Sequence, residues 1–422
     1  MFAARKVGAF AVNVGFATVL GVVSIPTLVG SIGPEAWASI ALSQSVSQLF
    51  GILVAFGWGA TGPSTIAAAP PSDRPRIYRQ SLISRSYLFV IGYLAQTVAL
   101  TLLTRGDLAL AALGSFAYLL PFVGASWYFV GDARPGRMFL CDSLPSLIGA
   151  VSGLIGAAIT HNPLVFLALQ ATGNLCSVII DAIVILRKSP SSGAALGLSP
   201  RAALLGLKGQ SHAVTSAILS GLYVNTPIVA VQILDPRLLP VYTMADRFFR
   251  YASVAYSPIQ QYLQGWVPHR GVAEQERRIR LAVWVALGFG VAGGAAVAVL
   301  SPFLSVLLSH GKIAVPFAFS VPLGIAFVGV AMSAVVGYAC LVVLDRSPVL
   351  AASTFVGAVV GIPLMILFAA LHLPAGVAWG VAASELLVSG YQLTALAAEL
   401  RRRRQSTEAR SEPHAEERPN HG

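Results

Sequence analysis

Two arginines and an aspartate inside one apolar block are the residues of this chain best suited to bind a charged ligand. Arg247 and Arg250 lie in the stretch 238–265. Asp246 precedes Arg250 by four residues, the favourable acid-first spacing of a helical pair. One carboxylate cannot neutralise two guanidinium groups, and guanidinium binds phosphate through two parallel hydrogen bonds. The pattern therefore predicts a positively charged site for an anionic group.

The depth of these arginines makes them costly to bury. At about 1.5 Å per residue, they lie roughly 14 and 18 Å into a helix that enters a ~30 Å hydrocarbon core near Leu238. Each costs at least about 2.5–3.5 kcal/mol even on the more lenient insertion scales. Glu385, in the stretch 374–400, supplies a second acid at a similar depth. It either closes a purely structural charge network with the arginines or couples transport to a proton, and both interpretations stay open.

Uncharged polar residues in the neighbouring blocks extend this candidate site. Ten and fourteen residues after Pro34 come two glutamines, and at the same distances after Pro236 come Asp246 and Arg250. The matched spacing predicts that two polar helix faces oppose each other across a shared cavity. The predicted uncharged members of the substrate-binding set are Asn13, Gln44, Gln48, Asn225 and Gln232.

The composition places these residues in a membrane protein. Of 422 residues, 56% are apolar and only 11% are charged, against roughly 25% charged in soluble domains. The apolar residues fall in blocks of about twenty, long enough to cross a bilayer. We expect an all-α polytopic membrane protein with twelve helices, at 8–30, 36–60, 82–104, 107–130, 139–160, 163–186, 209–234, 238–265, 281–308, 313–344, 347–370 and 374–400.

The two halves of the chain resemble each other at an offset near 201 residues. For example, the segment 116–121 matches the segment 317–322. Six spans return a chain to its starting side, so the offset predicts two parallel six-helix bundles, residues 1–200 and 201–400. Parallel repeats of this kind are typical of secondary transporters, whose binding sites lie between the halves.

Basic residues predict the orientation. With twelve spans, 23 Lys and Arg residues fall on one side of the membrane and only 3 on the other. Arg85 is counted among the 23. The basic side marks the cytoplasm, so both termini are expected to be cytoplasmic. Attraction to anionic lipid headgroups accounts for the net charge of +11 without a nucleic-acid partner. The polar end, 401–422, is expected to be a disordered cytoplasmic tail.

Other motifs indicate packing instead of chemistry. The segment 288–293 matches a dinucleotide-binding fingerprint, but it lies within an apolar block that no strand precedes. The three cysteines have no metal-ligand spacing and there is no Walker loop, so we expect no metal, no cofactor and no ATP hydrolysis. Small-residue pairs predicted to pack helices are Gly149/Gly153, Gly290/Gly294, Gly357/Gly361 and Gly376/Gly380.

Several soft motifs, in their order along most of the chain, resemble the Wzx-type O-antigen and polysaccharide flippases. They are Asn13, Ile25-Pro26, Ile32-Gly33-Pro34-Glu35-Ala36-Trp37, Phe56-Gly57, Trp127-Tyr128-Phe129-Val130-Gly131, Tyr242-Thr243-Met244-Ala245-Asp246-Arg247, Pro258-Ile259-Gln260-Gln261 and Trp266-Val267-Pro268. The resemblance implies a V-shaped pair of bundles like that of the MATE transporters, with alternating access, in the bacterial inner (cytoplasmic) membrane. It also implies movement of an undecaprenyl-diphosphate-linked oligosaccharide from the inner to the outer leaflet, alongside other polysaccharide-assembly membrane proteins.

Two other functions are alternatives to a flippase. A multidrug-type exporter of small molecules would share the fold, although a positively charged cavity would repel the cations that such proteins usually export. A membrane glycosyltransferase or polymerase would need larger loops or acidic metal and sugar motifs, and the chain has no DxD sequence. We therefore expect a protein that is not an enzyme.

Overall fold

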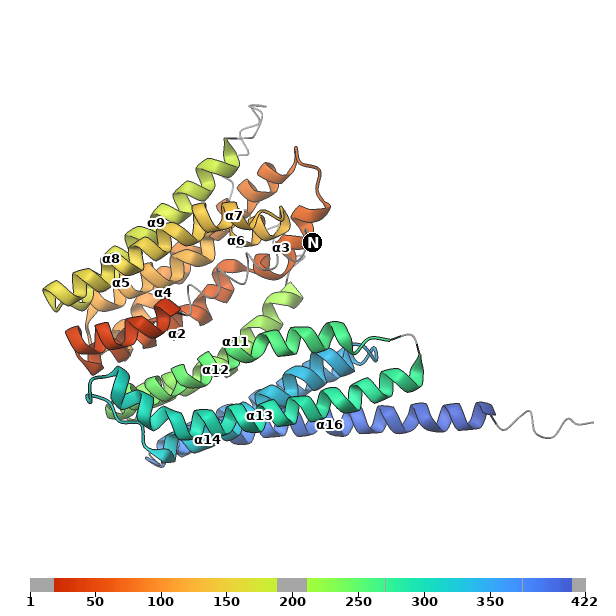
Figure 1. The fold of residues 1–422 in the computed structure, drawn as a ribbon. Helices are drawn as coiled ribbons and strands as arrows, with labels where there is room; N and C mark the ends of the chain where they lie inside the picture. Colours follow the sequence, from red (N-terminus) through yellow and green to blue (C-terminus); the bar gives the residue numbers. More distant parts are fainter. Residues whose placement is uncertain (1–18, 188–210, 270, 374, 412–422) are drawn as a thin grey trace, which may run out of the picture. The chain divides into compact units, whose positions relative to one another are not determined.

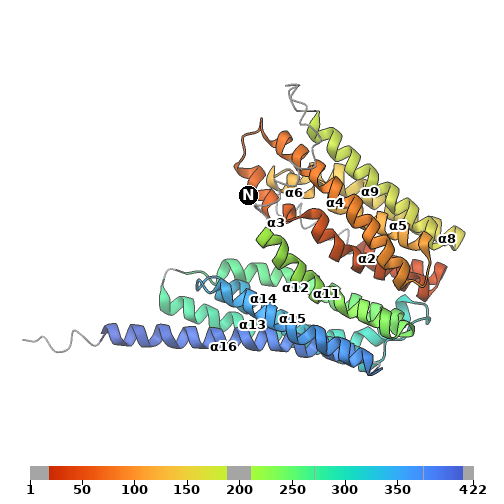
Figure 2. The same ribbon diagram turned by 180° about the vertical axis from the view of Figure 1, so that it is seen from behind.

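The computed structural model describes residues 19–187, 211–269, 271–373 and 375–411, and in this part the regular structure is all helical (Figures 1 and 2). Two apolar helices in it are short, Val19–Ile32 and Gly221–Leu234. Nine others are long and apolar enough to cross a membrane: Pro34–Ala55, Arg74–Leu103, Leu108–Gly131, Pro135–Thr160, Pro163–Leu186, Val272–Leu308, Phe317–Leu341, Pro348–Ala370 and Gly376–Arg403. The chain is thus a multi-pass membrane protein, and the total of twelve spans stays a prediction.

The chain divides into two compact units. Unit 1 comprises residues up to Met244 together with Phe303–Val315, and unit 2 comprises Ala245–Pro302 together with the residues from Pro316 onward. The predicted boundary near residue 200 lies outside the described residues and stays a prediction, as does the internal repeat.

In unit 1, two tightly packed helices, α8 and α9, run side by side, and α5 packs on α9 (Figures 1 and 2). α2 contacts α4, α5 and α11. The helices of this unit, besides Val19–Ile32, are α2 (Pro34–Ala55), α3 (Trp58–Ala68), α4 (Arg74–Leu103), α5 (Leu108–Leu119), the 3₁₀ turn η1 (Leu120–Val123), α6 (Ser126–Gly131), α7 (Pro135–Arg137), the π-helical turn η2 (Met138–Ser143), α8 (Leu144–Thr160), α9 (Pro163–Leu186), α11 (Ser211–Leu234) and the 3₁₀ turn η4 (Pro236–Leu238).

Unit 2 has a similar packing order, in which α14 and α15 both contact α16. Its core includes Tyr256, Phe327 and Met332. Its elements are α12 (Leu239–Trp266) from Ala245 on, α13 (Val272–Leu308) up to Pro302, α14 (Phe317–Val335), the π-helical turn η5 (Val336–Leu341), α15 (Ser347–Ala370) and α16 (Gly376–Ser411).

Local sequence signals set several helix ends. α9 begins where the Asn162 side chain accepts a hydrogen bond from the Leu164 amide and Pro163 occupies the first turn. Its bounds match the predicted 163–186. The predicted helix 36–60 instead divides into α2 and α3, because Phe56 and Gly57 take left-handed backbone conformations, with φ of 39° and 80°. Glycine adopts this left-handed conformation readily, whereas phenylalanine rarely does.

α4 begins at Arg74, eight residues before the predicted start at 82. Arg85, which the orientation count places with the cytoplasmic loops although the predicted helix 82–104 contains it, lies within α4 and is only 1% exposed. That assignment was wrong. The basic and polar first turns of α4 lowered the local hydropathy, so the sequence pattern placed the start of the helix too late.

Residues 401–411 are helical, although they were predicted to belong to a disordered tail. α16 continues through the run of arginines at 401–404 to Ser411. Glu399 pairs with Arg403 one turn later at 3.0 Å and with Arg346 at the start of α15 at 2.6 Å. These contacts extend the helix beyond the predicted start of the disordered tail at residue 401.

Members of two of the predicted glycine pairs, Gly149 and Gly294, lie where helices pack closely. A side chain on Gly149 would lie 2.7 Å from the Cα atom of Gly173, across the contact of α8 with α9. In unit 2, a side chain on Gly294 would lie 2.5 Å from the Gly324 carbonyl oxygen. Only hydrogen fits at these positions, so the helix backbones approach closely.

Candidate functional site

The charged group on α12 has the geometry expected from its spacing. The Arg250 Nε atom lies 2.6 Å from the Asp246 Oδ2 atom. The Asp246 side chain is 13% exposed, whereas the Arg250 side chain remains 36% exposed. Arg247, between them in sequence, is half-buried. The ion pair therefore orients the Arg250 guanidinium while leaving part of it accessible.

The glutamines on α2 lie one turn apart. Gln44 is half-buried and Gln48 is exposed. α11 packs on α2, where a side chain on Gly221 would lie 2.2 Å from the Ile52 side chain. The two glutamines thus belong to the same packed pair of helices as the predicted residues on α11.

On α11, both predicted polar side chains are buried and bonded to backbone. The Asn225 Nδ2 atom donates to the Gly221 carbonyl of its own helix at 2.9 Å. The Gln232 Nε2 atom donates to the Leu103 carbonyl at the end of α4. Both bonds join or stabilise helices of unit 1. Asn13 lies outside the described residues.

Glu385 lies in α16 and is half-buried. Its backbone packs against α14. A side chain on Gly329 of α14 would lie only 2.7 Å from the Glu385 carbonyl carbon. The predicted opposition of the polar faces of α2 and α12, and the choice between the two roles of Glu385, stay predictions.

Unit 1 contains a buried charged group that the sequence interpretation missed. It lies at a break in the fourth predicted helix, where α5 gives way to the 3₁₀ turn η1 and α6 begins only at Ser126. We call its members, Arg85, Asp142, Ser177 and Asp181, the Arg85 cluster. Three of the four are below 5% exposure, and the two acids fall inside predicted spans.

The Arg85 cluster satisfies backbone groups that the helix break leaves without helical partners. The Arg85 Nη1 atom donates to the carbonyls of Phe122 and Gly124 at 3.0 and 2.9 Å. Its guanidinium carbon also lies 5.4 Å from the centre of the Trp127 ring. From α9, the Asp181 Oδ2 atom accepts a hydrogen bond from the Ala125 amide at 3.1 Å. One cation and one anion therefore cap the two sides of the break.

Asp142 is the second acid of the cluster. The Ser177 hydroxyl lies 3.1 Å from its Oδ1 atom and 2.9 Å from its carbonyl oxygen. The sequence did contain a signal for this group. Two aspartates inside apolar blocks need a cation or several donors nearby, and the structure supplies Arg85 as a cation that interacts with Asp181.

Three solved membrane proteins have similar folds. An inward-facing multidrug resistance MATE family transporter of the MOP superfamily matches with a TM-score of 0.66 and 14% identity, over 91% of this chain and 96% of the other. The lipid II flippase MurJ, in an inward closed conformation, matches with a TM-score of 0.65 and 13% identity, over 92% and 87%. The MATE multidrug transporter DinF-BH matches with a TM-score of 0.59 and 16% identity, over 94% of each chain.

Because the sequence identities are low, these likenesses show a shared fold and nothing more. No family model and no curated protein matches the sequence. The predicted MATE-like fold is confirmed at this level, whereas the resemblance to the Wzx-type flippases stays a prediction within the same broad group of folds.

Proposed function

We propose that this protein is a flippase that moves an undecaprenyl-diphosphate-linked oligosaccharide from the inner to the outer leaflet of the bacterial inner membrane. In this proposal Arg247 and Arg250 bind the diphosphate. The observation that carries it is the partial exposure of Arg250, 36%, while the ion pair with Asp246 holds it in place. A guanidinium held in this way can add bidentate contacts to phosphate.

The membrane potential supplies a direction for this step. The diphosphate is an anion, and the cell interior is negative. Outward movement of an anion is therefore favoured by about 2.3 kcal/mol per charge for each 100 mV. A positively charged site also lowers the cost of taking the headgroup through the hydrocarbon core. Glu385 would balance the arginines when the cargo is absent, or carry a proton in exchange.

The sugar would contact the uncharged polar residues predicted on both halves of the chain. Gln44 and Gln48 are the stronger candidates, since Asn225 and Gln232 already bond to backbone carbonyls. Asn13 completes the proposed set. Alternating access would occur between bundles 1–200 and 201–400, with both termini in the cytoplasm. Other membrane proteins of polysaccharide assembly would supply and use the cargo.

A multidrug-type exporter of small molecules is the second candidate. The specific observation in its favour is that the likeness to a MATE multidrug transporter is as strong as the likeness to the lipid II flippase, with TM-scores of 0.66 and 0.65. The two functions differ in the sign of the charge on the cargo. The arginines of α12 favour a negatively charged cargo.

The test compares lipid extracts from cells that lack the protein and are complemented with wild type, Arg250→Ala or Arg401→Ala. Arg401 is an exposed cation near the end of α16 and serves as the control. We expect a lipid-linked oligosaccharide to accumulate without the protein and with Arg250→Ala, at equal protein abundance, but not with wild type or Arg401→Ala.

Normal lipid-linked sugars in the deletion strain, with no second flippase present, would refute the flippase proposal. Accumulation that Arg250→Ala relieves fully would refute only the assignment of the headgroup to α12. Export of cationic dyes by the wild type would then favour the second candidate.

A further inference from the structure

An apolar groove runs between α12 and α13 in unit 2. Its volume is about 520 Å³. Apolar and aromatic side chains line it, six of which form two rows: Pro258, Tyr262 and Trp266 on α12, and Leu281, Val285 and Phe289 on α13. Spacings of four residues put each row on one helix face.

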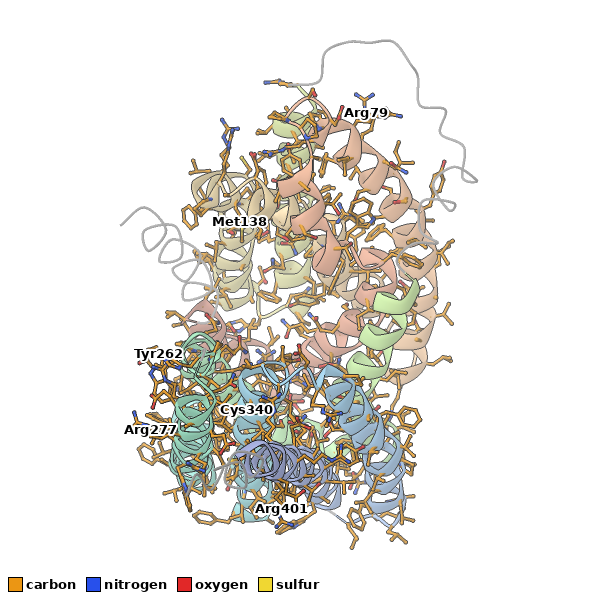
Figure 3. The ribbon with its side chains drawn as sticks, turned by 90° about the vertical axis from the view of Figure 1, so that its right-hand side faces the viewer. Arg79, Met138, Tyr262, Arg277, Cys340 and Arg401 are labelled. Carbon is orange, nitrogen blue, oxygen red and sulfur yellow. The ribbon has the colours of Figure 1, made fainter. Side chains whose placement is uncertain are left out.

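The groove opens to the outside of unit 2. Tyr262 is 67% exposed, Leu281 is 50% exposed and Phe289 is 51% exposed. In the proposal below, this exposed apolar surface faces lipid. The row on α13 continues one turn further to Arg277, four residues before Leu281. Figure 3 shows Arg277 and Tyr262 on the same side of the unit.

The end of the groove is a basic rim made by Arg277 and Arg278. Both arginines pair with the single carboxylate of Glu274, at 2.9 and 3.0 Å. Arg278 also lies 5.2 Å from the centre of the Trp266 ring and donates to the Trp266 carbonyl at 2.8 Å. Arg277 keeps a side chain that is 71% exposed. Two guanidiniums and one carboxylate leave one net positive charge at the rim.

The dimensions of this surface suit one leaflet of a bilayer. From Arg277 to Phe289 is twelve residues, or about 18 Å along the helix. Half of a ~30 Å hydrocarbon core is about 15 Å. A lipid whose phosphate lies at Arg277 would thus have its chain along the groove as far as the bilayer centre, in the orientation that lipids of that leaflet already have.

We propose that this groove binds an anionic phospholipid with one net negative charge, its acyl chain against Tyr262, Leu281 and Phe289 and its phosphate at Arg277. The charge at the rim selects this occupant. One net positive charge matches the single negative charge of a phosphodiester, whereas a polyprenyl diphosphate carries more negative charge than the rim can balance. Aromatic side chains such as Trp266 are typical of the membrane interface, where headgroup and chain meet.

This lipid site is separate from the proposed cargo site and does not depend on the flippase activity. The lipid would link α12 to α13 at the end of unit 2 that is predicted to be cytoplasmic. We expect bound lipid to stabilise the contact between these helices.

The test measures lipid binding to the purified full-length protein in detergent by native mass spectrometry. The probes are phosphatidylglycerol, phosphatidylcholine with the same acyl chains, and undecaprenyl phosphate. Two variants perturb the site: Arg277→Glu reverses the exposed charge of the rim, and Val285→Trp fills the groove. Their controls are Arg401→Glu, at an exposed cation of α16, and Val299→Trp, at a 61% exposed position of α13 outside the groove.

We expect phosphatidylglycerol to bind at least tenfold more tightly than phosphatidylcholine, and Arg277→Glu to abolish that preference. Val285→Trp should weaken the binding of both phospholipids, and the two controls should change neither. Equal binding of the two phospholipids by the wild type, or an unchanged preference in Arg277→Glu, would overturn the proposal. Tighter binding of undecaprenyl phosphate than of phosphatidylglycerol would overturn it as well, since the groove would then hold a polyprenyl chain.

Discussion

Replacing Arg85 by methionine should strongly destabilise unit 1. Methionine has a similar length and apolar character, so it fills most of the space but donates no hydrogen bonds. The change leaves the Phe122 and Gly124 carbonyls at the helix break without the donor that now satisfies them. It also removes the positive charge near the buried Asp181.

The magnitude follows from these contacts. Hydrogen bonds from a charged donor contribute about 1.5–3 kcal/mol each, which gives about 3–6 kcal/mol for the two carbonyls. Because a buried guanidinium is itself costly to desolvate, part of this gain is lost in the wild type. Removing one member of a buried charged group typically costs about 3–5 kcal/mol. We expect the free energy of unfolding to fall by about that amount, a large share of a typical 5–15 kcal/mol.

Equilibrium unfolding of the purified protein in mixed micelles, followed by tryptophan fluorescence, measures the change. Arg76→Met is the matched control, because Arg76 lies on the same helix and is exposed. That control should alter the free energy by no more than about 0.5 kcal/mol. If Arg85→Met unfolds within the same narrow range as Arg76→Met, the argument that Arg85 stabilises the helix break is wrong.

Two further predictions concern packing and the end of the chain. Gly324→Ala would place a methyl group 2.4 Å from the Gly294 carbonyl oxygen, so it should cost about 1–3 kcal/mol in a thermal unfolding assay. Gly288→Ala, with nothing within 4 Å, should be neutral or stabilise by up to about 1 kcal/mol, and equal losses for both would contradict the packing model. Glu399→Gln removes the pairs with Arg346 and Arg403, so hydrogen exchange should become faster after residue 400 but not within α9. Unchanged exchange there would show that the ion pairs do not hold the helix end.

Helices whose ends carry their own signals were predictable from the sequence. The bounds of α9 and of α15, 163–186 and 347–370, agree with the prediction. Both begin with proline in the first turn, which lacks an amide donor and suits the start of a helix. In these cases the apolar block and the terminal signal coincide, so the hydropathy pattern alone is sufficient.

The start of α4 and the break after α5 were not predictable in the same way. Hydropathy averages over a window, so the polar first turns of α4 concealed the beginning of the helix. The break depends on two residues that are distant in sequence. Arg85 binds the carbonyl of Gly124, 39 residues away, and Asp181 binds the amide of Ala125, 56 residues away. Pro121 is compatible with such a break, but the partners that make the break stable come from tertiary packing.

Arg85 and Arg250 both lie within helices of this chain but have different physical surroundings, and the difference bears on function. Arg85 is 1% exposed and donates to backbone carbonyls of another segment, which fixes it in a structural role. Arg250 pairs with Asp246 of its own helix and is 36% exposed. A ligand can reach the second guanidinium without displacing the fold, whereas it cannot reach the first. Loss of Arg85 should therefore lower the amount of folded protein, and loss of Arg250 should lower transport at normal abundance. If Arg250→Ala reduced abundance as much as Arg85→Met, a structural role would explain both arginines and the proposed headgroup site on α12 would lose its basis.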